Sequence, residues 1–521
     1  MFNLLKILSQ LDFLSLSKLG RLGFAIHQNG INLMLLFTLT KKTGNEKTAL
    51  VDSHEVLSYK ELQKRCEHLA YFLADRYGVG EKQKVAFYCK NHASLVQGIF
   101  AASRLGADLY LLNSSMRQLQ FNKLVEEHRF DLLIYDEEFS DLIERSPYRN
   151  PKICSYHEKY EAIATLPELS LHRKQKLKPS SSGKIVLLTG GTTGKPKQVI
   201  HRPSLFNFLD PFAALLNRLQ LPNYSTVYIA TPIYHGYGIA VLLSFLALGK
   251  KVVIQESFDA ERACALIQQH HIEVVTVVPL MIHKMLKHDK ASLASLACIA
   301  SGGAKLNPAL VNEVNHQLGD ILYNLYGTSE AGLNIIAVPE DFKHHANTLG
   351  KLIDGGQMQV VVEGKEVEPG NIGQFCIRNK WSMKNNPSGW IQTGDIGYRD
   401  EKGYYFLCGR TDDLIISAGN NIYPLEIEVA LTNHPSIEDV AVVGVEDVYS
   451  GQILKAFVQL YHDKSLTPSE LSSWLSTHVA GFQIPREIVF VDHLPYTAVG
   501  KLDRKRIQTI KSNELFYRGG I

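Results

Sequence analysis

The chain has 521 residues, more than a single hydrophobic core usually supports, so we expect two or three domains. Hydrophobic residues make up 45% of the sequence and charged residues 21%, which is typical of a globular protein, and a net charge of +3 gives no reason to expect a nucleic-acid partner. The seven cysteines include no Cys-x-x-Cys pair, which is evidence against a disulfide framework or a structural zinc site and predicts a reducing, cytoplasmic setting.

Residues 1–40 form an apolar-rich N-terminal extension with scattered basic side chains. Its leucines recur at near-helical spacing: Leu4, Leu5, Leu8, Leu11 and Leu14. We expect an amphipathic helix that packs on its own domain. The alternative is a peripheral helix that lies on a membrane surface. The longest mainly apolar run of the chain, 239–248, is much shorter than the roughly 20 residues that a membrane span needs.

Short apolar runs alternate with amphipathic segments over residues 49–135. The predicted strands cover 49–51, 85–88 and 131–135. Between the first two, Ser58 and Glu61 have the spacing of a capping box, so we expect a helix that runs through Phe72. This alternation predicts an α/β domain with largely parallel sheets.

A buried strand over 185–189 leads into a loop rich in glycine, threonine and lysine. The candidate phosphate-binding residues are Thr189, Gly190, Gly191, Thr192, Thr193, Gly194, Lys195 and Lys197. Glycines let backbone N–H groups approach an anion, and the hydroxyls and ammonium groups suit a polyphosphate. The P-loop of nucleotide hydrolases fits poorly, because Thr189 replaces its first glycine and Pro196 follows the lysine. A plain Gly/Thr surface turn remains the alternative.

A second candidate site residue is His235, which lies between a strand end and two glycines in the segment 231–238. Its place after the phosphate loop favours a functional role over that of an ordinary polar residue. Tyr234 and His235 offer no carboxylate for a substrate ammonium, and a buried ammonium without a partner is costly. We therefore expect an acid substrate without an α-amino group.

The segment 322–330 combines groups that suit a nucleotide and a metal. Tyr326 can stack on a purine, the Ser329 hydroxyl can bond to a phosphate, and Glu330 is an oxygen ligand suited to Mg²⁺. A polar corner between a strand and a loop is the alternative. Further along, Asp395 could accept bonds from both ribose hydroxyls.

Together these elements resemble the adenylate-forming enzymes: acyl-CoA synthetases, luciferases and the adenylation domains of peptide synthetases. The phosphate loop keeps the family pattern from Gly191 to Lys197, and 322–330 carries its Tyr-Gly-x-[Ser/Thr]-Glu motif. Leu188 replaces a tyrosine of the family pattern, Gly190 a serine and Gln198 a glycine. Loss of the serine removes one hydroxyl donor to phosphate, so we expect weaker ATP binding. The matching elements extend from residue 189 to 501.

The resemblance implies roles for the remaining candidates. His235 would lie beside the carboxylate being activated, and Lys501 would neutralise charge as pyrophosphate leaves. Arg410 would bind the ribose, Asp412 would be the hinge of a mobile small domain, and Gly419 would leave room for pantetheine. The other residues assigned to the nucleotide and acyl sites are Gly303, Ala304, Asn324, Gly327 and Thr328.

The resemblance also implies the fold and the reaction. We expect a large AMP-binding α/β domain over 1–410 and a small, mobile α+β domain over 411–521. The expected enzyme is an ATP-dependent, AMP-forming acyl-CoA synthetase that uses ATP, Mg²⁺ and coenzyme A. Similarity of residues 112–119 to fatty acyl-CoA synthetases favours a medium- or long-chain fatty acid. The alternatives are an aryl acid, transfer to the pantetheine of a carrier protein, or a nucleotide-binding protein without catalysis.

Overall fold

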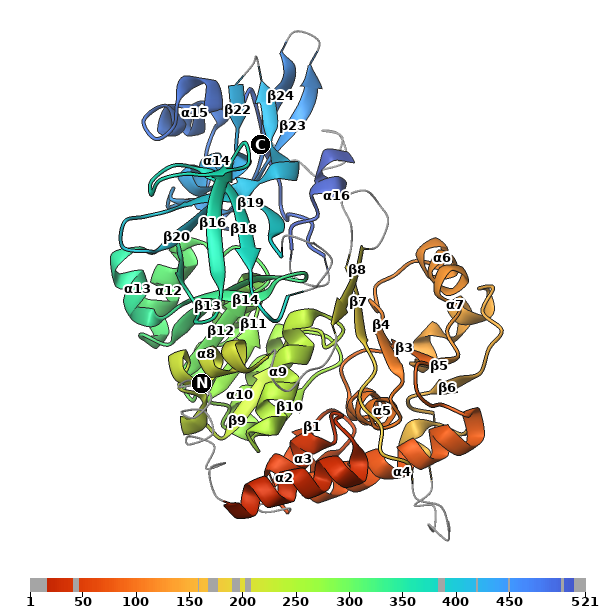
Figure 1. Cartoon of the computed structure of the whole chain (residues 1–521). Coiled ribbons are helices and arrows are strands. Elements are labelled where there is room, and N and C mark those ends of the chain that lie inside the picture. The colour runs from red at the N-terminus through yellow and green to blue at the C-terminus, as the bar shows by residue number, and fades with distance from the viewer. Residues whose placement is uncertain are drawn as a thin grey trace.

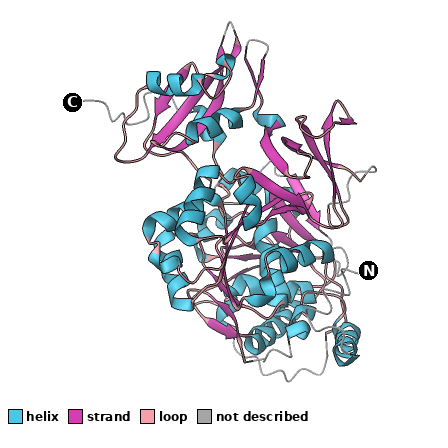
Figure 2. Cartoon of the chain, turned by 90° about the vertical axis from the view of Figure 1, so that its left-hand side faces the viewer, coloured by secondary structure: helices cyan, strands magenta, loops and turns pink. Residues whose placement is uncertain are grey.

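The computed structural model of the chain has three sheets and the helices that cover them (Figure 1). The described residues are 16–40, 46–157, 159–166, 177–189, 197–201, 208–382, 389–417, 420–447, 450–497 and 501–509. Figure 2 shows the smallest sheet with its helices at one end, beyond the helix-rich body of the molecule.

The six-stranded sheet contains the strand that leads into the phosphate loop. Its strand order is β6 (Lys152–Cys154), β5 (Leu132–Tyr135), β3 (Lys84–Tyr88), β4 (Asp108–Leu111), β7 (Ile185–Thr189) and β8 (Lys197–His201). All neighbours in this sheet are parallel except β7 and β8, which form a hairpin. The helices in this part of the chain are α4 (Tyr59–Tyr77), α5 (Ala93–Arg104), α6 (Gln118–His128) and α7 (Ser140–Glu144).

The fourteen-stranded sheet begins with parallel strands and continues with antiparallel ones. Its parallel part contains β1 (Thr48–Val51), β10 (Lys251–Ile254), β9 (Thr226–Ile229), β11 (Val274–Val277), β12 (Cys298–Gly302) and β13 (Leu322–Thr328). Its antiparallel neighbours are β2 (Val56–Ser58), β14 (Gly332–Ala337), β15 (Thr348–Leu352), β16 (Gln357–Val362), β17 (Lys365–Glu366), β18 (Gly373–Arg378), β19 (Ile391–Arg399) and β20 (Tyr405–Arg410). The helices along this sheet are α8 (Leu209–Arg218), α9 (Gly236–Ala247), α10 (Ala260–His270), α11 (Pro279–His288), α12 (Pro308–Leu318) and α13 (Pro339–His344).

The predicted α/β fold class is confirmed, and the antiparallel part of the large sheet is an addition that the sequence analysis did not separate. The link between β13 and β14 is only three residues long, which allows antiparallel pairing, whereas parallel neighbours need a long crossover. One hydrophobic cluster joins strands of both large sheets to α5 and α9. Every residue of α5 is buried, as expected for a helix enclosed on all sides.

The predicted helix after Ser58 is present as α4 and has the predicted capping box. Ser58 accepts a hydrogen bond from the backbone of Glu61, whose carboxylate accepts one from the backbone of Ser58. Gly78 ends the helix in the left-handed conformation at φ 64°, which glycine adopts at little cost.

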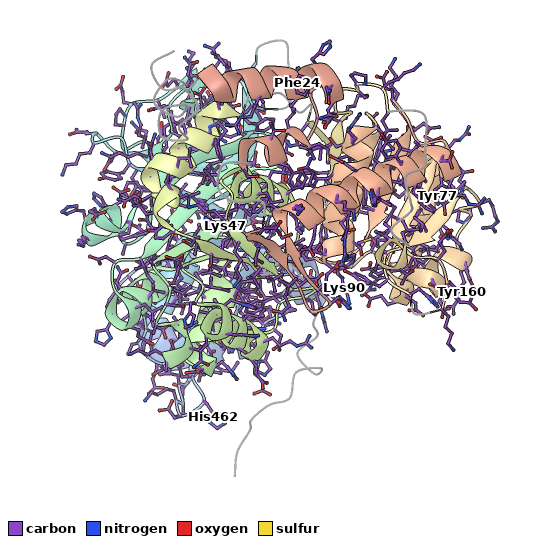
Figure 3. The ribbon with its side chains drawn as sticks, turned by 90° about the horizontal axis from the view of Figure 1, so that it is seen from below. Phe24, Lys47, Tyr77, Lys90, Tyr160 and His462 are labelled. Atoms are coloured by element: carbon purple, nitrogen blue, oxygen red, sulfur yellow. The ribbon has the colours of Figure 1, made fainter. Side chains whose placement is uncertain are left out.

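The described part of the N-terminal extension forms α2 (Leu16–Asn29) and α3 (Leu35–Thr40). Met34 and Phe37 are buried in the main hydrophobic cluster, and the Asn32 side chain donates to the Ser180 carbonyl at 3.0 Å. Phe24 on α2 is 63% exposed and lies at the surface in Figure 3. Packing on the domain is therefore present over 32–37, while residues 1–15 lie outside the described residues. None of the described helices is long and apolar enough to cross a membrane.

The third sheet belongs to the C-terminal part of the chain. Its strands are β21 (Ile415–Ser417), β22 (Asn420–Ile422), β23 (Ile437–Asp447), β24 (Gly451–Leu460) and β25 (Glu487–Phe490). The accompanying helices are α14 (Pro424–Thr432), α15 (Pro468–Ser476) and α16 (Arg504–Thr509). These elements have a hydrophobic cluster of their own, centred on residues such as Ile427, Leu431 and Leu471. The predicted domain boundary at residues 410 and 411 falls between β20 and β21 and stays a prediction.

Candidate active site

The predicted phosphate loop connects β7 to β8 at the end of the hairpin where Thr189 and Lys197 lie. Thr189 and Lys197 are paired across the hairpin, so the loop leaves and re-enters the sheet at the same point. The remaining predicted loop residues, Gly190, Gly191, Thr192, Thr193, Gly194 and Lys195, lie outside the described residues, and so does Gly419. Their assignments stay predictions.

Ser329 and Glu330 occupy a tight turn between β13 and β14. The Thr328 hydroxyl accepts a hydrogen bond from the Ala331 N–H at 3.0 Å, which closes the turn. A side chain on Gly327 would come within 2.3 Å of the Gly332 carbonyl oxygen, so this position requires glycine. The glycine of the predicted motif therefore allows the close backbone approach that presents Ser329 and Glu330.

Three residues that the sequence analysis missed hold this turn through hydrogen bonds, namely Asn334, Asn379 and Trp381. The Asn379 amide donates to the Ala331 carbonyl at 2.9 Å and to the buried Asn334 side chain at 2.7 Å. The Trp381 indole N–H donates to the Leu333 carbonyl at 3.0 Å. Asparagine and tryptophan at these distances along the chain give no recognisable pattern, so only the folded structure brings them together.

His201, at the end of β8, is a further neighbour that the sequence analysis missed. Its ring lies near the backbone of Ser329 and within charge-interaction range of Glu330. Burial lowers the pKa of His201, although both contacts oppose this shift. The signal available in the sequence was its place on the strand that returns from the phosphate loop.

Asp395 is the centre of a second group of site residues, in the middle of β19 and opposite the last residue of β20. Its carboxylate accepts a hydrogen bond from the Tyr326 hydroxyl at 2.7 Å and one from Arg410 Nη1 at 2.8 Å. Asp395 and Arg410 are direct partners across the two antiparallel strands, which fixes the pair. Burial raises the pKa of Asp395, and Arg410, Tyr326 and Lys501 oppose this shift. The predicted nucleotide residues Tyr326, Asp395 and Arg410 are thus in direct contact.

Lys501 reaches this group from the C-terminal sheet. A β-bridge between Tyr496 and Leu502 positions the lysine, and its backbone N–H donates to the Thr497 hydroxyl at 3.2 Å. Loss of hydration and the charge on Arg410 lower the pKa of Lys501, while Asp395 and Glu330 oppose the shift. Its ammonium therefore lies within charge-interaction range of two predicted site carboxylates contributed by the large domain.

His235 is the N-cap residue of α9 and points into the protein. Its Nε2 atom is buried and has no hydrogen-bond partner among the described residues. Burial, reinforced by the charge of Lys501, lowers the pKa of His235 to about 4, so the imidazole is neutral near pH 7. An unpartnered buried nitrogen costs about 1–3 kcal/mol, which a hydrogen bond to a ligand would offset.

Aromatic and small residues surround His235 and the end of β12. The Tyr234 ring lies 4.5 Å from the His235 ring, centroid to centroid. The Tyr237 hydroxyl donates to the Ala300 carbonyl at 2.8 Å, and its ring would contact a side chain on Gly302 at 3.3 Å. The predicted wall residues Gly303 and Ala304 follow directly on β12, and Asn324 is buried on the adjacent strand β13.

The assembled groups fit a magnesium–nucleotide complex. Glu330 supplies a carboxylate oxygen of the kind that Mg²⁺ prefers, Lys501 would supply positive charge for a polyphosphate, and Arg410 beside Asp395 would serve the ribose. Asp412 lies in the single 3₁₀ turn Thr411–Asp413 that follows β20, and its hinge role stays a prediction.

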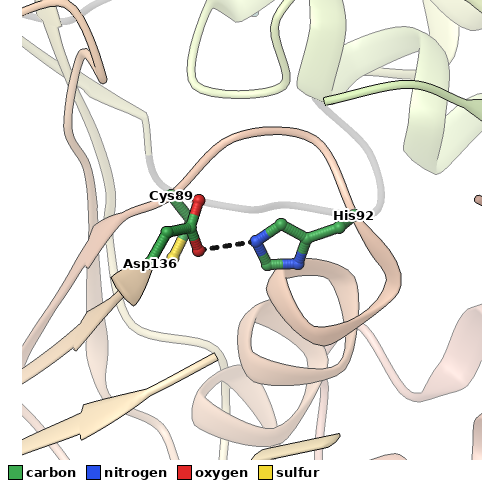
Figure 4. Close-up of side chains that lie close together, drawn as sticks. All are labelled: Cys89, His92 and Asp136. Carbon is green, nitrogen blue, oxygen red and sulfur yellow. Dashed lines mark hydrogen bonds and ion pairs between the residues drawn. The ribbon is translucent and has the colours of Figure 1, made fainter. Parts of the chain in front are cut away.

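A separate buried cluster, Cys89, His92 and Asp136, has side chains close enough to suggest a metal site (Figure 4). The His92 Nδ1 atom accepts a hydrogen bond from the Leu95 N–H, so Nε2 carries the hydrogen that it donates to Asp136 at 2.7 Å. Asp136 also accepts from the Lys90 N–H and the Ser155 hydroxyl. Because both nitrogens of His92 are engaged, this cluster is a hydrogen-bonded support and not a metal site.

Comparison with known proteins identifies the family. The model of the AMP-binding enzyme family matches residues 37–385, and the model of the AMP-binding enzyme C-terminal domain matches residues 426–501. A 2-succinylbenzoate–CoA ligase of Geobacillus sp. (strain WCH70) is 29% identical over 484 residues, which are 90% of this chain and 96% of that protein. A 2-succinylbenzoate–CoA ligase of Listeria innocua is 29% identical, with 90% of this chain and 97% of that protein covered.

Solved structures agree with this fold. The o-succinylbenzoate CoA synthetase of Bacillus subtilis with its acyl-adenylate intermediate has a TM-score of 0.78 at 24% identity, over 91% of this chain and 98% of that one. The anthranilate CoA ligase AuaEII with anthranoyl-AMP has a TM-score of 0.80 at 22% identity, over 92% and 96% of the two chains. The family model covers the six-stranded sheet, the Ser329–Glu330 turn and the fourteen-stranded sheet except β19 and β20. This chain belongs to the AMP-binding enzyme family.

Proposed function

We propose that the chain is an ATP-dependent acid–CoA ligase that activates a carboxylic acid as an acyl-adenylate and transfers the acyl group to coenzyme A. The observation that carries the proposal is the contact of Asp395 with Tyr326 and Arg410, with Lys501 of the C-terminal domain within charge-interaction range of it. The 2-succinylbenzoate–CoA ligases among its relatives support the acid–CoA reaction class.

In the first step a carboxylate oxygen attacks the α-phosphorus of ATP, and the bond to pyrophosphate breaks. The acid needs no general base, because it is already ionised near pH 7. Magnesium bound at Glu330 would neutralise charge on the phosphates. Ser329 would donate to the α-phosphate, Asp395 would accept from the ribose hydroxyls, and Lys501 would stabilise the charge on the departing pyrophosphate.

In the second step the thiol of coenzyme A attacks the acyl carbon and AMP leaves. Lys501 has no pyrophosphate to neutralise in this step, so the C-terminal domain is free to change its orientation. Rotation about Asp412 would withdraw Lys501 and bring Gly419 to the path of the pantetheine arm. Because Lys501 and Gly419 would act in different steps, substitutions at these two residues should affect different half-reactions.

For the acid we propose an aryl carboxylic acid, with 2-succinylbenzoate as the first candidate. The names of the relatives supply that candidate, and Tyr234 and Tyr237 beside His235 offer aromatic surfaces for a ring. Neither these residues nor Gly303 and Ala304 offer a carboxylate for an α-amino group. The reported relatives give no support to the predicted fatty-acid substrate.

Pyrophosphate release with a panel of acids tests the proposal. The panel contains 2-succinylbenzoate, benzoate, decanoate and palmitate, each with coenzyme A or a phosphopantetheinyl carrier protein as acceptor. We expect release with an aryl acid and a thioester on coenzyme A. Release with only the fatty acids would overturn the aryl proposal, and binding of ATP without release for any acid would overturn the ligase proposal.

A further inference from the structure

A histidine of the large domain lies between two carboxylates at the contact with the C-terminal domain. His283 is on α11, and its Nε2 atom lies 3.1 Å from a carboxylate oxygen of Glu438 on β23. Its Nδ1 atom lies 3.9 Å from a carboxylate oxygen of Glu313 on α12. Glu438 also contacts the ammonium of Lys287, one turn further along α11. The side chains of His283 and Glu438 are 20% and 13% exposed, so water screens this contact only in part.

The geometry favours the doubly protonated ring. A carboxylate only accepts hydrogen bonds, and a neutral imidazole has a single N–H, so one of the two carboxylates would face a bare nitrogen. An imidazolium presents an N–H to each of them. Burial opposes protonation, but the contacts with Glu313 and Glu438 outweigh it and raise the pKa of His283.

These residues line a cleft of about 1600 Å³ between the two domains. Its large-domain wall includes α11, and its opposite wall includes β23 and the segment 491–496 that leads to Lys501. The His283–Glu438 contact therefore joins the large domain to the same small domain that carries Lys501. The orientation that this contact holds is the one in which Lys501 lies within charge-interaction range of Asp395 and Glu330.

We propose that His283, together with Lys287, is a positioning residue that holds the C-terminal domain through Glu438 in the orientation needed for adenylate formation. The contact acts through Lys501 and touches no reacting atom. The expected effect on adenylate formation rests on the proposed function. The orientation of the domain can be measured without any substrate acid.

The contact also makes the orientation depend on pH. The titratable and charged groups that face His283 are Lys287 on α11, Glu313 on α12, Glu438 and Asp439 on β23, and Tyr461 after β24. Rotation removes Glu438 from the histidine, so the proton is held more tightly in the observed orientation. The observed orientation is therefore favoured as the pH falls through the raised pKa of His283 and loses this contribution as the pH rises through it.

The test compares His283→Gln with His288→Gln, a matched change at an exposed histidine of the same helix. Fluorescent labels on Tyr160→Cys and Ser473→Cys, one exposed site in each domain, report the domain distance, because the seven native cysteines are buried. Glu438→Gln is the second variant, and it keeps the size of the side chain. Adenylate formation is followed by pyrophosphate exchange, and thioester formation starts from synthetic acyl-AMP.

We expect His283→Gln and Glu438→Gln to shift the label distance and to slow adenylate formation about 5-fold or more, without slowing thioester formation. The distance in the parent should change between pH 6 and pH 8, and this change should be smaller in His283→Gln. Identical distances in His283→Gln and His288→Gln at every pH would overturn the proposal. A distance shift in a protein that activates no acid would support the positioning role and count against the proposed function alone.

Discussion

At the scale of single residues, the site depends on contacts between side chains that are far apart in the sequence. Asp395 binds the Tyr326 hydroxyl and Arg410, and Lys501 adds its charge from the other domain. These contacts hold the carboxylate of Asp395 in one orientation, with both of its oxygens engaged. A ribose hydroxyl would meet a group that is already oriented, which reduces the cost of binding.

The proposed magnesium ligand gives a direct prediction. Glu330→Gln keeps the size of the side chain but removes the charge that would face the metal. Adenylation should fall by about 100-fold or more, the effect expected from loss of one charged transition-state contact. Pyrophosphate release measured across Mg²⁺ concentrations checks this, with Glu340→Gln, an exposed acid on α13, as control. Near wild-type release at every Mg²⁺ concentration would refute the ligand assignment.

The surroundings of His235 predict which acids fail. Among the described residues no carboxylate contributes to the pKa of the neutral His235 imidazole, so we expect a substrate ammonium to be buried there without a partner. We expect ATP–pyrophosphate exchange with unsubstituted acids and none above background with α-amino acids. Exchange driven by an α-amino acid, and by no simple aryl or fatty acid, would contradict this view of the pocket.

Sequence motifs singled out the candidate site residues, whose roles stay predictions, but not the residues that support them. Tyr326, Glu330, Asp395 and Lys501 stand in short patterns whose chemistry is readable before folding. Their supports are single asparagine, tryptophan and histidine residues with no local pattern, namely Asn334, Asn379, Trp381 and His201. The contact between Tyr326 and Asp395 also escaped prediction, because it joins two strands of the sheet, β13 and β19, that β14, β15 and β20 separate.

At the scale of elements, the buried Asp136 ties three of them together. It accepts hydrogen bonds from the Lys90 backbone after β3, from His92 at the start of α5 and from Ser155 after β6. Burial opposes ionisation, but these donors outweigh it and lower the pKa of Asp136. Its ionised form therefore stabilises the fold, and this contribution is lost as the pH falls through the lowered pKa.

We predict that Asp136→Asn lowers the free energy of unfolding by about 3 kcal/mol at pH 7, because it leaves buried donors without a charged acceptor. The difference from the parent should shrink below about pH 4, where the unfolded carboxyl protonates. Denaturant unfolding at several pH values checks both statements. Zn²⁺ and a chelator should leave the melting temperature unchanged. A melting temperature that rises with Zn²⁺ would show that the cluster is a metal site after all.

The N-terminal helices give a second prediction at this scale. Phe37 on α3 is 2% exposed and contacts the Phe100 ring at 4.8 Å, whereas Phe24 on α2 is 63% exposed. Phe37→Ala should lower the free energy of unfolding by about 3 kcal/mol, and Phe24→Ala by less than about 1 kcal/mol. Equal, small effects in thermal or denaturant unfolding would contradict packing of this extension on the domain.

The order of strands and helices was largely predictable, because apolar runs and capping residues are local signals. The long antiparallel part of the fourteen-stranded sheet was not predictable, because the register of a strand and the sheet that it joins depend on strands far away in the sequence. Packing of residues 32–37 on the domain agrees with the prediction, although periodicity alone cannot separate a packed helix from one on a membrane.

At the scale of the whole molecule, the two domains divide the reaction between them. The large domain holds Glu330, Asp395 and Arg410, and the C-terminal domain contributes Lys501 to the same place. Under the proposed function, this orientation would serve the step in which pyrophosphate leaves. A different orientation for the thioester step, with Gly419 at the pantetheine path, stays a prediction.

The measurement that tests this account most directly is the rate of each half-reaction in Lys501→Ala. Adenylate formation should fall by about 100-fold or more, while thioester formation from synthetic acyl-AMP should stay close to the parent rate. Gly419→Leu should show the reverse, and Lys464→Ala, at an exposed lysine of the same domain, should change neither. Equal losses of both half-reactions in Lys501→Ala and in Gly419→Leu would contradict the account, because the C-terminal domain would then act as a static cover.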